Sequence, residues 1–283
     1  MKLLSFERNG RTGVARLDTD GSAYDLLSAG VSDMLALIEG RQTIAGRGEL
    51  LDDYSLLAPI PRPVRDIFCV GKNYAEHARE FGGSGFDGGA KGGDEVPEAP
   101  IIFTKATTSI VASGKPIDSS SDPDATVDYE GELAVVIGRG GRRIGADDAM
   151  SHVFGYTVLN DVTAREAQKR HKQWVLGKGA DSFCPVGPVI LTAGAVPDPA
   201  ALRLTTHVNG ELRQDALVAD LIFDIPTLIA TLSAFITLLP GDVIATGTPA
   251  GVGIGFTPPR YLRAGDVVRV EIDAIGVLEN PVI

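Results

Sequence analysis

From about residue 67 onward, short apolar runs alternate with segments rich in glycine, proline and polar residues. Apolar runs of this length, bounded by turn-forming residues, are typical of β-strands. The pattern predicts strands at residues 67–70, 101–104, 132–137, 155–159, 186–192, 204–208, 242–246 and 267–272. Strands and helices do not alternate regularly, so a doubly wound parallel sheet is not expected.

Helical spacing is confined to a few segments. Residues 226–239 are predicted as the one long helix, which ends at Pro240-Gly241 because neither residue continues a helix well. A membrane-spanning helix needs about 20 apolar residues, so we interpret this segment as a buried helix. Shorter helices are expected at residues 73–81 and 162–170.

The first sixty residues have a pattern of their own. Apolar residues at 3–7 and 13–17 flank Asn9-Gly10, a strong hairpin signal, and residues 31–39 have helical spacing. Prolines at positions 59, 61 and 63 then suggest a linker. The sequence therefore predicts a small N-terminal α/β domain at residues 1–60 and a larger domain at residues 61–283. The expected fold class is α+β, mostly β.

Charge and cysteine content narrow the function. The chain has 26 Lys+Arg against 37 Asp+Glu, a formal net charge of −11. This balance argues against nucleic-acid binding, which needs clustered positive charge. The apolar run at the N-terminus is too short for a signal peptide, so we expect a cytoplasmic protein with no membrane partner. Cys69 and Cys184 fit neither a zinc framework nor a disulfide scaffold and are interpreted as packing residues.

Several familiar motifs can be set aside. Residues 251–255 read Gly-Val-Gly-Ile-Gly, which superficially resembles a nucleotide-binding loop. The final glycine has the wrong spacing, and two prolines follow where a helix would begin, so we predict a turn. The sequence contains no phosphate-binding loop motif, no G-x-S-x-G nucleophile motif and no H-E-x-x-H zinc motif.

Acidic residues gather before and after two predicted strands. Glu130 and Glu132 would share one face of a strand, and Asp128 could join them. Carboxylates that enter a core side by side repel each other unless a cation such as Mg²⁺ or Mn²⁺ lies between them. A solvated acidic strand end is the alternative. Asp161 precedes a predicted helix and could cap it, bind a metal, or do both.

A possible acid–base pair lies on the predicted helix at residues 73–81. His77 and Glu80 are three positions apart, which places them on one helical face. A histidine oriented by a carboxylate is a general-base unit, and the alternative is a surface ion pair. Two other segments are described by their composition alone. Lys178 lies between two glycines and could be a solvated loop lysine. Residues 82–99 are rich in glycine and are expected to form a mobile loop.

Taken together, these segments resemble the fumarylacetoacetate hydrolase family over about residues 60–283. The matching blocks run in order along the chain: residues 70–74 with His77 and Glu80, 100–105, 128–133, 155–165, 178–188, 209–211 and 240–249. The resemblance implies a mixed β-sandwich roll, usually dimeric, preceded by a small N-terminal domain in many bacterial members. A homodimer is therefore expected.

The resemblance also implies a metal site and its surroundings. It assigns Glu130, Glu132 and Asp161 as the ligands of Mg²⁺ or Mn²⁺. It places the acid–base pair of His77 and Glu80 on a lid, and Lys178 near the developing enolate. Arg165 and Gln168 would face the pocket, and Thr248 would contact the substrate carboxylate. Family members often carry Ser-Phe or Ser-Leu after the lysine. Gly179-Ala180 stand there in this chain, which leaves the shape of the pocket open.

The activity favoured by the resemblance is hydrolysis of a C–C bond in a 2,4-dioxo acid, such as an acylpyruvate or a fumarylpyruvate, through a metal-stabilised pyruvate enolate. The intact pair of His77 and Glu80 supports hydrolysis because it could activate water. Two other reactions need the same enolate and remain alternatives. They are the decarboxylation of oxaloacetate and the isomerisation of a diacid of the 2-hydroxyhepta-2,4-diene-1,7-dioate type. A non-catalytic small-acid binder is the alternative from another class.

Overall fold

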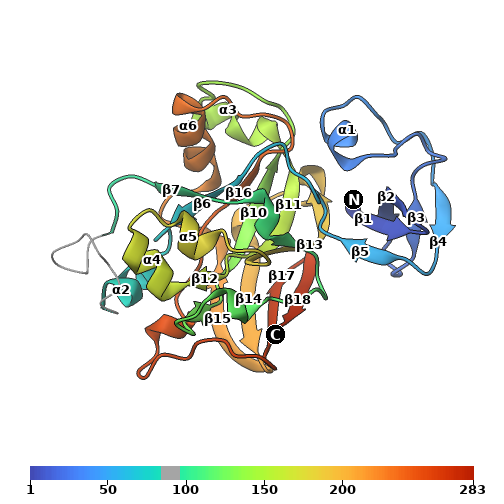
Figure 1. Cartoon of the computed structure of the whole chain (residues 1–283). Helices are drawn as coiled ribbons and strands as arrows, with labels where there is room; N and C mark the ends of the chain where they lie inside the picture. Colours follow the sequence, from blue (N-terminus) through green and yellow to red (C-terminus); the bar gives the residue numbers. More distant parts are fainter. Residues whose placement is uncertain (84–95) are drawn as a thin grey trace.

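The computed structural model describes residues 1–83 and 96–283 (Figure 1). The loop predicted at residues 82–99 therefore lies largely outside the described residues. The first five strands gather at one side of the molecule, and helices α2 (Ala75–Gly83) and α4 (Arg165–His171) lie on the opposite side. Both sides are connected through one continuous sheet.

That large sheet has twelve strands, most of them antiparallel. Its strands, in spatial order, are β4 (Glu49–Leu51), β3 (Ala23–Asp25), β2 (Arg11–Leu17), β1 (Lys2–Arg8), β13 (Cys184–Thr192), β11 (Val153–Asn160), β10 (Gly131–Ile137), β16 (Val243–Ala245), β6 (Ile67–Gly71) and β7 (Ile101–Lys105). Two further strands join it at the side, β5 (Ser55–Leu57) next to β1 and β8 (Ile110–Val111) next to β13. The predicted strands in these segments are confirmed.

A second sheet and a small strand pair complete the β structure. The second sheet contains β15 (Glu211–Leu217), β14 (Arg203–Val208), β17 (Val267–Ile272) and β18 (Gly276–Pro281), and the pair is β9 (Val127–Asp128) with β12 (Thr163–Ala164). Strands β14 and β17 alternate buried and more exposed residues, whereas every residue of β10 is buried. One apolar core joins residues of both sheets, such as Leu133, Leu204 and Val270. The predicted mostly-β sandwich fold is confirmed.

The helices are short and mostly peripheral. Helix α6 (Ile225–Phe235) begins at Asp224, whose side chain accepts the backbone N–H of Thr227. It ends four residues before the predicted end at residue 239, because Ile236 returns to an extended conformation. The others are α1 (Met34–Ile38), α3 (Ala146–Ala149) and α5 (Val175–Lys178). In the part of the chain that the structure describes, no helix has the length and apolar character needed to cross a membrane.

The N-terminal hairpin forms as predicted. Strands β1 and β2 pair in register from Lys2 opposite Leu17 to Arg8 opposite Arg11, with Asn9 and Gly10 in the turn. Both turn residues have positive φ, which asparagine and glycine tolerate. Strand β1 also pairs with β13, so the hairpin extends the large sheet. A domain boundary near residue 60 stays a prediction.

Candidate metal centre

Three buried carboxylates converge where β10 begins and β11 ends. Strands β10 and β11 pair with Glu132 opposite Leu159, and the backbone N–H of Asp161 donates to the carbonyl of Glu130 at 2.8 Å. This pairing brings one oxygen each of Glu130, Glu132 and Asp161 within 4.8 Å of one another. All three residues are buried. The alternative of a solvated acidic strand end is therefore wrong.

Asp128 does not belong to this cluster, although the strand pattern allowed it. The chain leaves β9 after Asp128 and enters β10 at Gly131, so the simple alternation of faces is interrupted. The Asp128 carboxylate instead accepts the backbone N–H of Gly253 at 2.6 Å and of Ile254 at 3.0 Å. It also accepts a hydrogen bond from Nε of Arg165 at 2.9 Å.

Asp161 is not a helix cap. Helix α4 begins at Arg165 with Ala164 as its N-cap, because the chain first forms the short strand β12 opposite β9. The carboxylate of Asp161 is instead held by two lysines, with Oδ1 at 2.6 Å from Nζ of Lys105 and Oδ2 at 2.7 Å from Nζ of Lys178. The alternative that Asp161 caps the following helix is therefore wrong.

Buried cations surround the acidic cluster. Lys178 ends helix α5, is only 2% exposed, and also donates to Oε2 of Glu130 at 2.8 Å, so it is not a solvated loop lysine. Arg165 pairs with Oε1 of Glu130 at 2.6 Å. Lys105 is fully buried at the end of β7, and the sequence pattern does not identify it as a site residue. A lysine that ends an apolar strand is the signal that could have identified it.

The three carboxylates differ in their electrostatics. Burial raises the pKa of Glu132 well above its ordinary value, and the neighbouring charges of Asp161 and Glu130 raise it further. Its Oε2 accepts the backbone N–H of Gly247 at 2.8 Å, and among the described residues no lysine or arginine is paired with it. Burial alone would also raise the pKa of Glu130, but Lys178 and Arg165 outweigh it and lower that pKa to about 2.

The donor set fits a hard divalent cation. All three groups offer oxygen, the ligand type that Mg²⁺ and Mn²⁺ prefer. Together with the neighbouring Asp128, the three carboxylates carry four negative charges when ionised, and the buried side chains of Lys105, Lys178 and Arg165 carry three positive charges. A divalent cation would change this formal net charge from −1 to +1, which suits an anionic substrate.

The predicted acid–base pair forms on α2. Nδ1 of His77 lies 3.3 Å from Oε2 of Glu80, and His77 is only 4% exposed, so the pair is not a surface ion pair. The ring of Phe81 lies 6.2 Å from the His77 ring and 5.7 Å from the guanidinium of Arg165, which in turn pairs with Glu130. The structure thus brings His77 to the same site as the carboxylates.

Gln168 and Thr248 are also buried beside the cluster. Oε1 of Gln168 lies 3.3 Å from the Arg165 guanidinium. The hydroxyl of Thr248 donates to the carbonyl of Gly131 at 3.0 Å and accepts from Nε2 of Gln214 at 2.7 Å. Contact with a substrate carboxylate would require this hydroxyl to turn away from Gly131. The substrate-binding roles of Arg165, Gln168 and Thr248 stay predictions.

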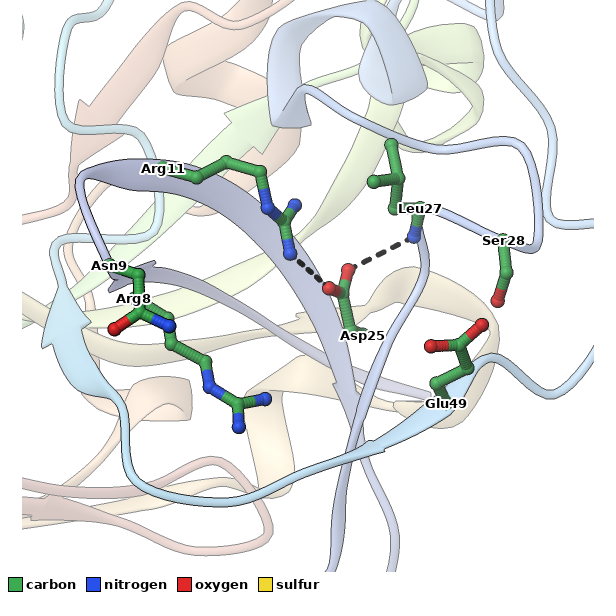
Figure 2. A pocket seen from close by; sticks show the side chains of 7 residues that line it. All are labelled: Arg8, Asn9, Arg11, Asp25, Leu27, Ser28 and Glu49. Atoms are coloured by element: carbon green, nitrogen blue, oxygen red, sulfur yellow. Dashed lines mark hydrogen bonds and ion pairs between the residues drawn. The ribbon is translucent and has the colours of Figure 1, made fainter.

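A separate cavity lies in the N-terminal hairpin region (Figure 2). Its lining residues are Arg8, Asn9, Arg11, Asp25, Leu27, Ser28 and Glu49. Figure 2 shows Asp25 between Arg11, with which it forms an ion pair, and the backbone N–H of Leu27, which donates to it at 3.0 Å. This cavity contains none of the predicted site residues, so the acidic cluster is the better candidate site.

The chain belongs to the fumarylacetoacetate hydrolase family. The sequence profile described as fumarylacetoacetate hydrolase C-terminal matches residues 66–283, which include the acidic cluster and the pair on α2. The family resemblance and the fold that it implied are therefore confirmed.

Relatives of this chain carry different named activities. Oxaloacetate tautomerase YisK of Bacillus subtilis (strain 168) is 49% identical over 232 residues, which cover 82% of this chain and 74% of that protein. The solved structure of fumarylacetoacetate hydrolase from Exiguobacterium antarcticum is 42% identical and matches with a TM-score of 0.87 over 100% of this chain and 99% of that one. A 5-carboxymethyl-2-hydroxymuconate delta-isomerase from Mycobacterium smegmatis is 36% identical, with a TM-score of 0.80 over 100% and 99% of the two chains.

Proposed function

We propose that this protein is a divalent-metal-dependent enzyme that interconverts the enol and keto forms of oxaloacetate. The observation that carries the proposal is the buried group of Glu130, Glu132 and Asp161, together with a histidine paired to a carboxylate on helix α2. The name of the Bacillus subtilis relative, an oxaloacetate tautomerase, supports this choice among the reactions that share an enolate. Oxaloacetate is an anion at neutral pH, which suits the positive formal charge of the metal-loaded site.

The reaction needs proton transfer and nothing else. In going from enol to keto form, the hydroxyl on C2 loses a proton and C3 gains one, so no water is consumed. Nδ1 of His77 faces Glu80, which leaves Nε2 on the opposite edge of the ring to exchange the proton at C3. Lys178 carries its charge beside Glu130 and Asp161, where it would stabilise negative charge on the C2 oxygen. A bound divalent cation supplies a Lewis acid that lowers the energy of the same charge.

Hydrolysis of a 2,4-dioxo acid is the second candidate. The intact pair of His77 and Glu80 favours it, because a histidine oriented by a carboxylate can take a proton from water. Water would add to the distal carbonyl, the bond between C3 and C4 would break, and a carboxylic acid and pyruvate would be released. The structural match to a fumarylacetoacetate hydrolase over the whole chain supports this reading.

Replacing His77 with glutamine should lower the rate of enol-to-keto conversion by about 10²-fold, because the residue that exchanges the C3 proton is lost. The decay of enol oxaloacetate absorbance in the presence of Mn²⁺ measures this rate. Acetylpyruvate hydrolysis is assayed in parallel. His152→Gln is the matched control, because that histidine bonds to Asp148 and to the carbonyl of Arg139.

Equal tautomerisation rates for wild type and His77→Gln would remove His77 from the mechanism. Release of pyruvate from acetylpyruvate without any effect on enol oxaloacetate would select the hydrolase instead. Binding of oxalate with no turnover of either compound would favour a non-catalytic binder and contradict both enzyme proposals.

Removing the metal should abolish activity reversibly. EDTA is expected to stop turnover, and added Mg²⁺ or Mn²⁺ to restore it, since the three carboxylates would lose the cation that offsets their repulsion. A metal that binds only the folded state stabilises it by about 2.7 kcal/mol at a hundredfold excess over Kd. Thermal unfolding in EDTA, with and without Mn²⁺, measures this gain. Full activity in EDTA would contradict a metal-dependent mechanism.

A further inference from the structure

The loop at residues 251–255 is fixed to the end of strand β9. Oδ1 of Asp128 accepts the backbone N–H of Gly253 at 2.6 Å, and Oδ2 accepts that of Ile254 at 3.0 Å. The neighbouring Tyr129 donates its hydroxyl to the carbonyl of Gly251 at 2.8 Å. Asp128 is fully buried, and it takes no part in the proposed reaction. Its hydrogen bonds to the loop and to Arg165 compensate for the burial of its charge.

The other side of the same loop receives Glu80 from helix α2. The backbone N–H of Gly251 donates to both carboxylate oxygens, at 3.0 Å to Oε1 and 3.2 Å to Oε2. Gly255 lies directly against the Glu80 side chain, where an added Cβ would overlap the carboxylate. Val252 and Ile254 pack in one small apolar cluster with Phe81, the residue that follows Glu80.

We propose that residues 251–255 form a cradle that positions Glu80, and through Glu80 the ring of His77, with Asp128 anchoring the cradle. Among the described residues, the Glu80 carboxylate is bonded by the backbone N–H of Gly251 on one side and faces the His77 ring on the other, so the loop fixes where this carboxylate lies. The glycines at 251 and 255, which superficially suggest a nucleotide-binding loop, would then be needed because the Glu80 carboxylate lies directly against the loop backbone. This inference rests on the proposed role of His77 in proton transfer.

Gly255→Ala tests the cradle without touching the acidic cluster. The backbone of Gly255 is outside the left-handed region, so alanine fits the main chain, and its new Cβ meets the movable end of Glu80. We expect a folded protein whose kcat is lower by about 10- to 100-fold, the usual effect of losing a supporting partner. Its Mn²⁺ affinity should be unchanged. Gly145→Ala is the matched control, since a Cβ there meets nothing within 4 Å.

A double-mutant cycle separates this effect from general damage. In a Glu80→Ala background the displaced carboxylate is already absent, so Gly255→Ala should cause no further loss of kcat. Two losses that multiply would overturn the proposal, because Gly255 would then act by a route other than Glu80. A loss confined to Mn²⁺ affinity would overturn it as well.

The protonation of the His77 ring gives a readout that needs no turnover. With Glu80 in the cradle, the neutral ring should carry its proton on Nδ1, which faces the carboxylate. Long-range ¹H–¹⁵N spectra, assigned with His77→Gln, should show this form in wild type and a shift toward the Nε2-protonated form in Gly255→Ala. An identical His77 signal in both proteins would overturn the cradle. The expected shift in a protein that converts no 2-oxo acid would leave the cradle standing and reject the proposed function.

Discussion

Replacing Glu132 with glutamine is expected to abolish Mn²⁺ binding and to lower turnover by about 10³-fold or more. Among the described residues, Glu132 is the clustered carboxylate that no lysine or arginine pairs with, so a bound metal would supply the positive charge beside it. Lewis-acid stabilisation contributes several kcal/mol, and each 1.36 kcal/mol is about a factor of ten in rate. Titration calorimetry with Mn²⁺ and the enol oxaloacetate assay measure the two effects.

The same substitution should stabilise the metal-free protein at neutral and higher pH. Burial and the adjacent carboxylates raise the pKa of Glu132 in the folded state, so the folded protein holds this proton more tightly than the unfolded chain. Stability is therefore lost as pH rises from the ordinary pKa of glutamate through the raised one. Glutamine cannot ionise, so Glu132→Gln should lack that part of the loss.

Thermal unfolding in EDTA at several pH values between about 5 and 9 tests this expectation. Glu49→Gln is the control, because Glu49 is exposed and lies in the N-terminal hairpin region. Retained Mn²⁺ binding by Glu132→Gln would contradict the proposed centre. If the Tm of Glu132→Gln fell with pH as steeply as that of wild type, the raised pKa of Glu132 would not be the cause of the pH dependence.

The elements that the sequence predicts correctly are those whose pattern depends on residues close together in the chain. The hairpin around Asn9-Gly10 and the buried strand β10 follow from residues within a few positions of each other, and both form as predicted. Helix α2 places His77 beside Glu80 for the same reason, since a helical spacing of three residues is a local rule. Strands β15 and β18 were not predicted. Strand β15 mixes charged and apolar residues, so no apolar run marks it.

The parts of the site that could not be predicted depend on contacts far apart in the chain. Lys105 reaches Asp161 across 56 positions, and Asp128 reaches Gly253 across 125. Asp161 looks like a candidate helix cap in the sequence, because the strand β12 that follows it has only two residues and shows no strand pattern. From the sequence alone, Lys178 is compatible with a solvated loop, because the burial of a lysine depends on partners from other segments.

Lys105→Met is expected to lower the free energy of unfolding by about 3–5 kcal/mol, the cost of removing one partner from a buried ion pair. Nζ of Lys105 is fully buried and donates to Oδ1 of Asp161 at 2.6 Å, to the carbonyl of Val162 at 2.9 Å and to the carbonyl of Lys178. Methionine fills similar space but donates nothing, so a charge and two carbonyls would be left buried with fewer partners. Urea unfolding of the metal-free protein measures the loss.

The effect should extend to the metal centre, because Lys105 fixes Oδ1 of Asp161, one of the three clustered carboxylates, while Lys178 holds Oδ2. In Lys105→Met the Asp161 carboxylate keeps Lys178 as its charged partner but loses the one that fixes Oδ1, and we expect the rise in Tm on adding Mn²⁺ to be reduced or lost. Lys115→Met is the control, since Lys115 is exposed. If both variants unfolded at the same urea concentration and responded equally to Mn²⁺, Lys105 would have no part in holding the site, and the carboxylates would have to be oriented by Lys178 and Arg165 alone.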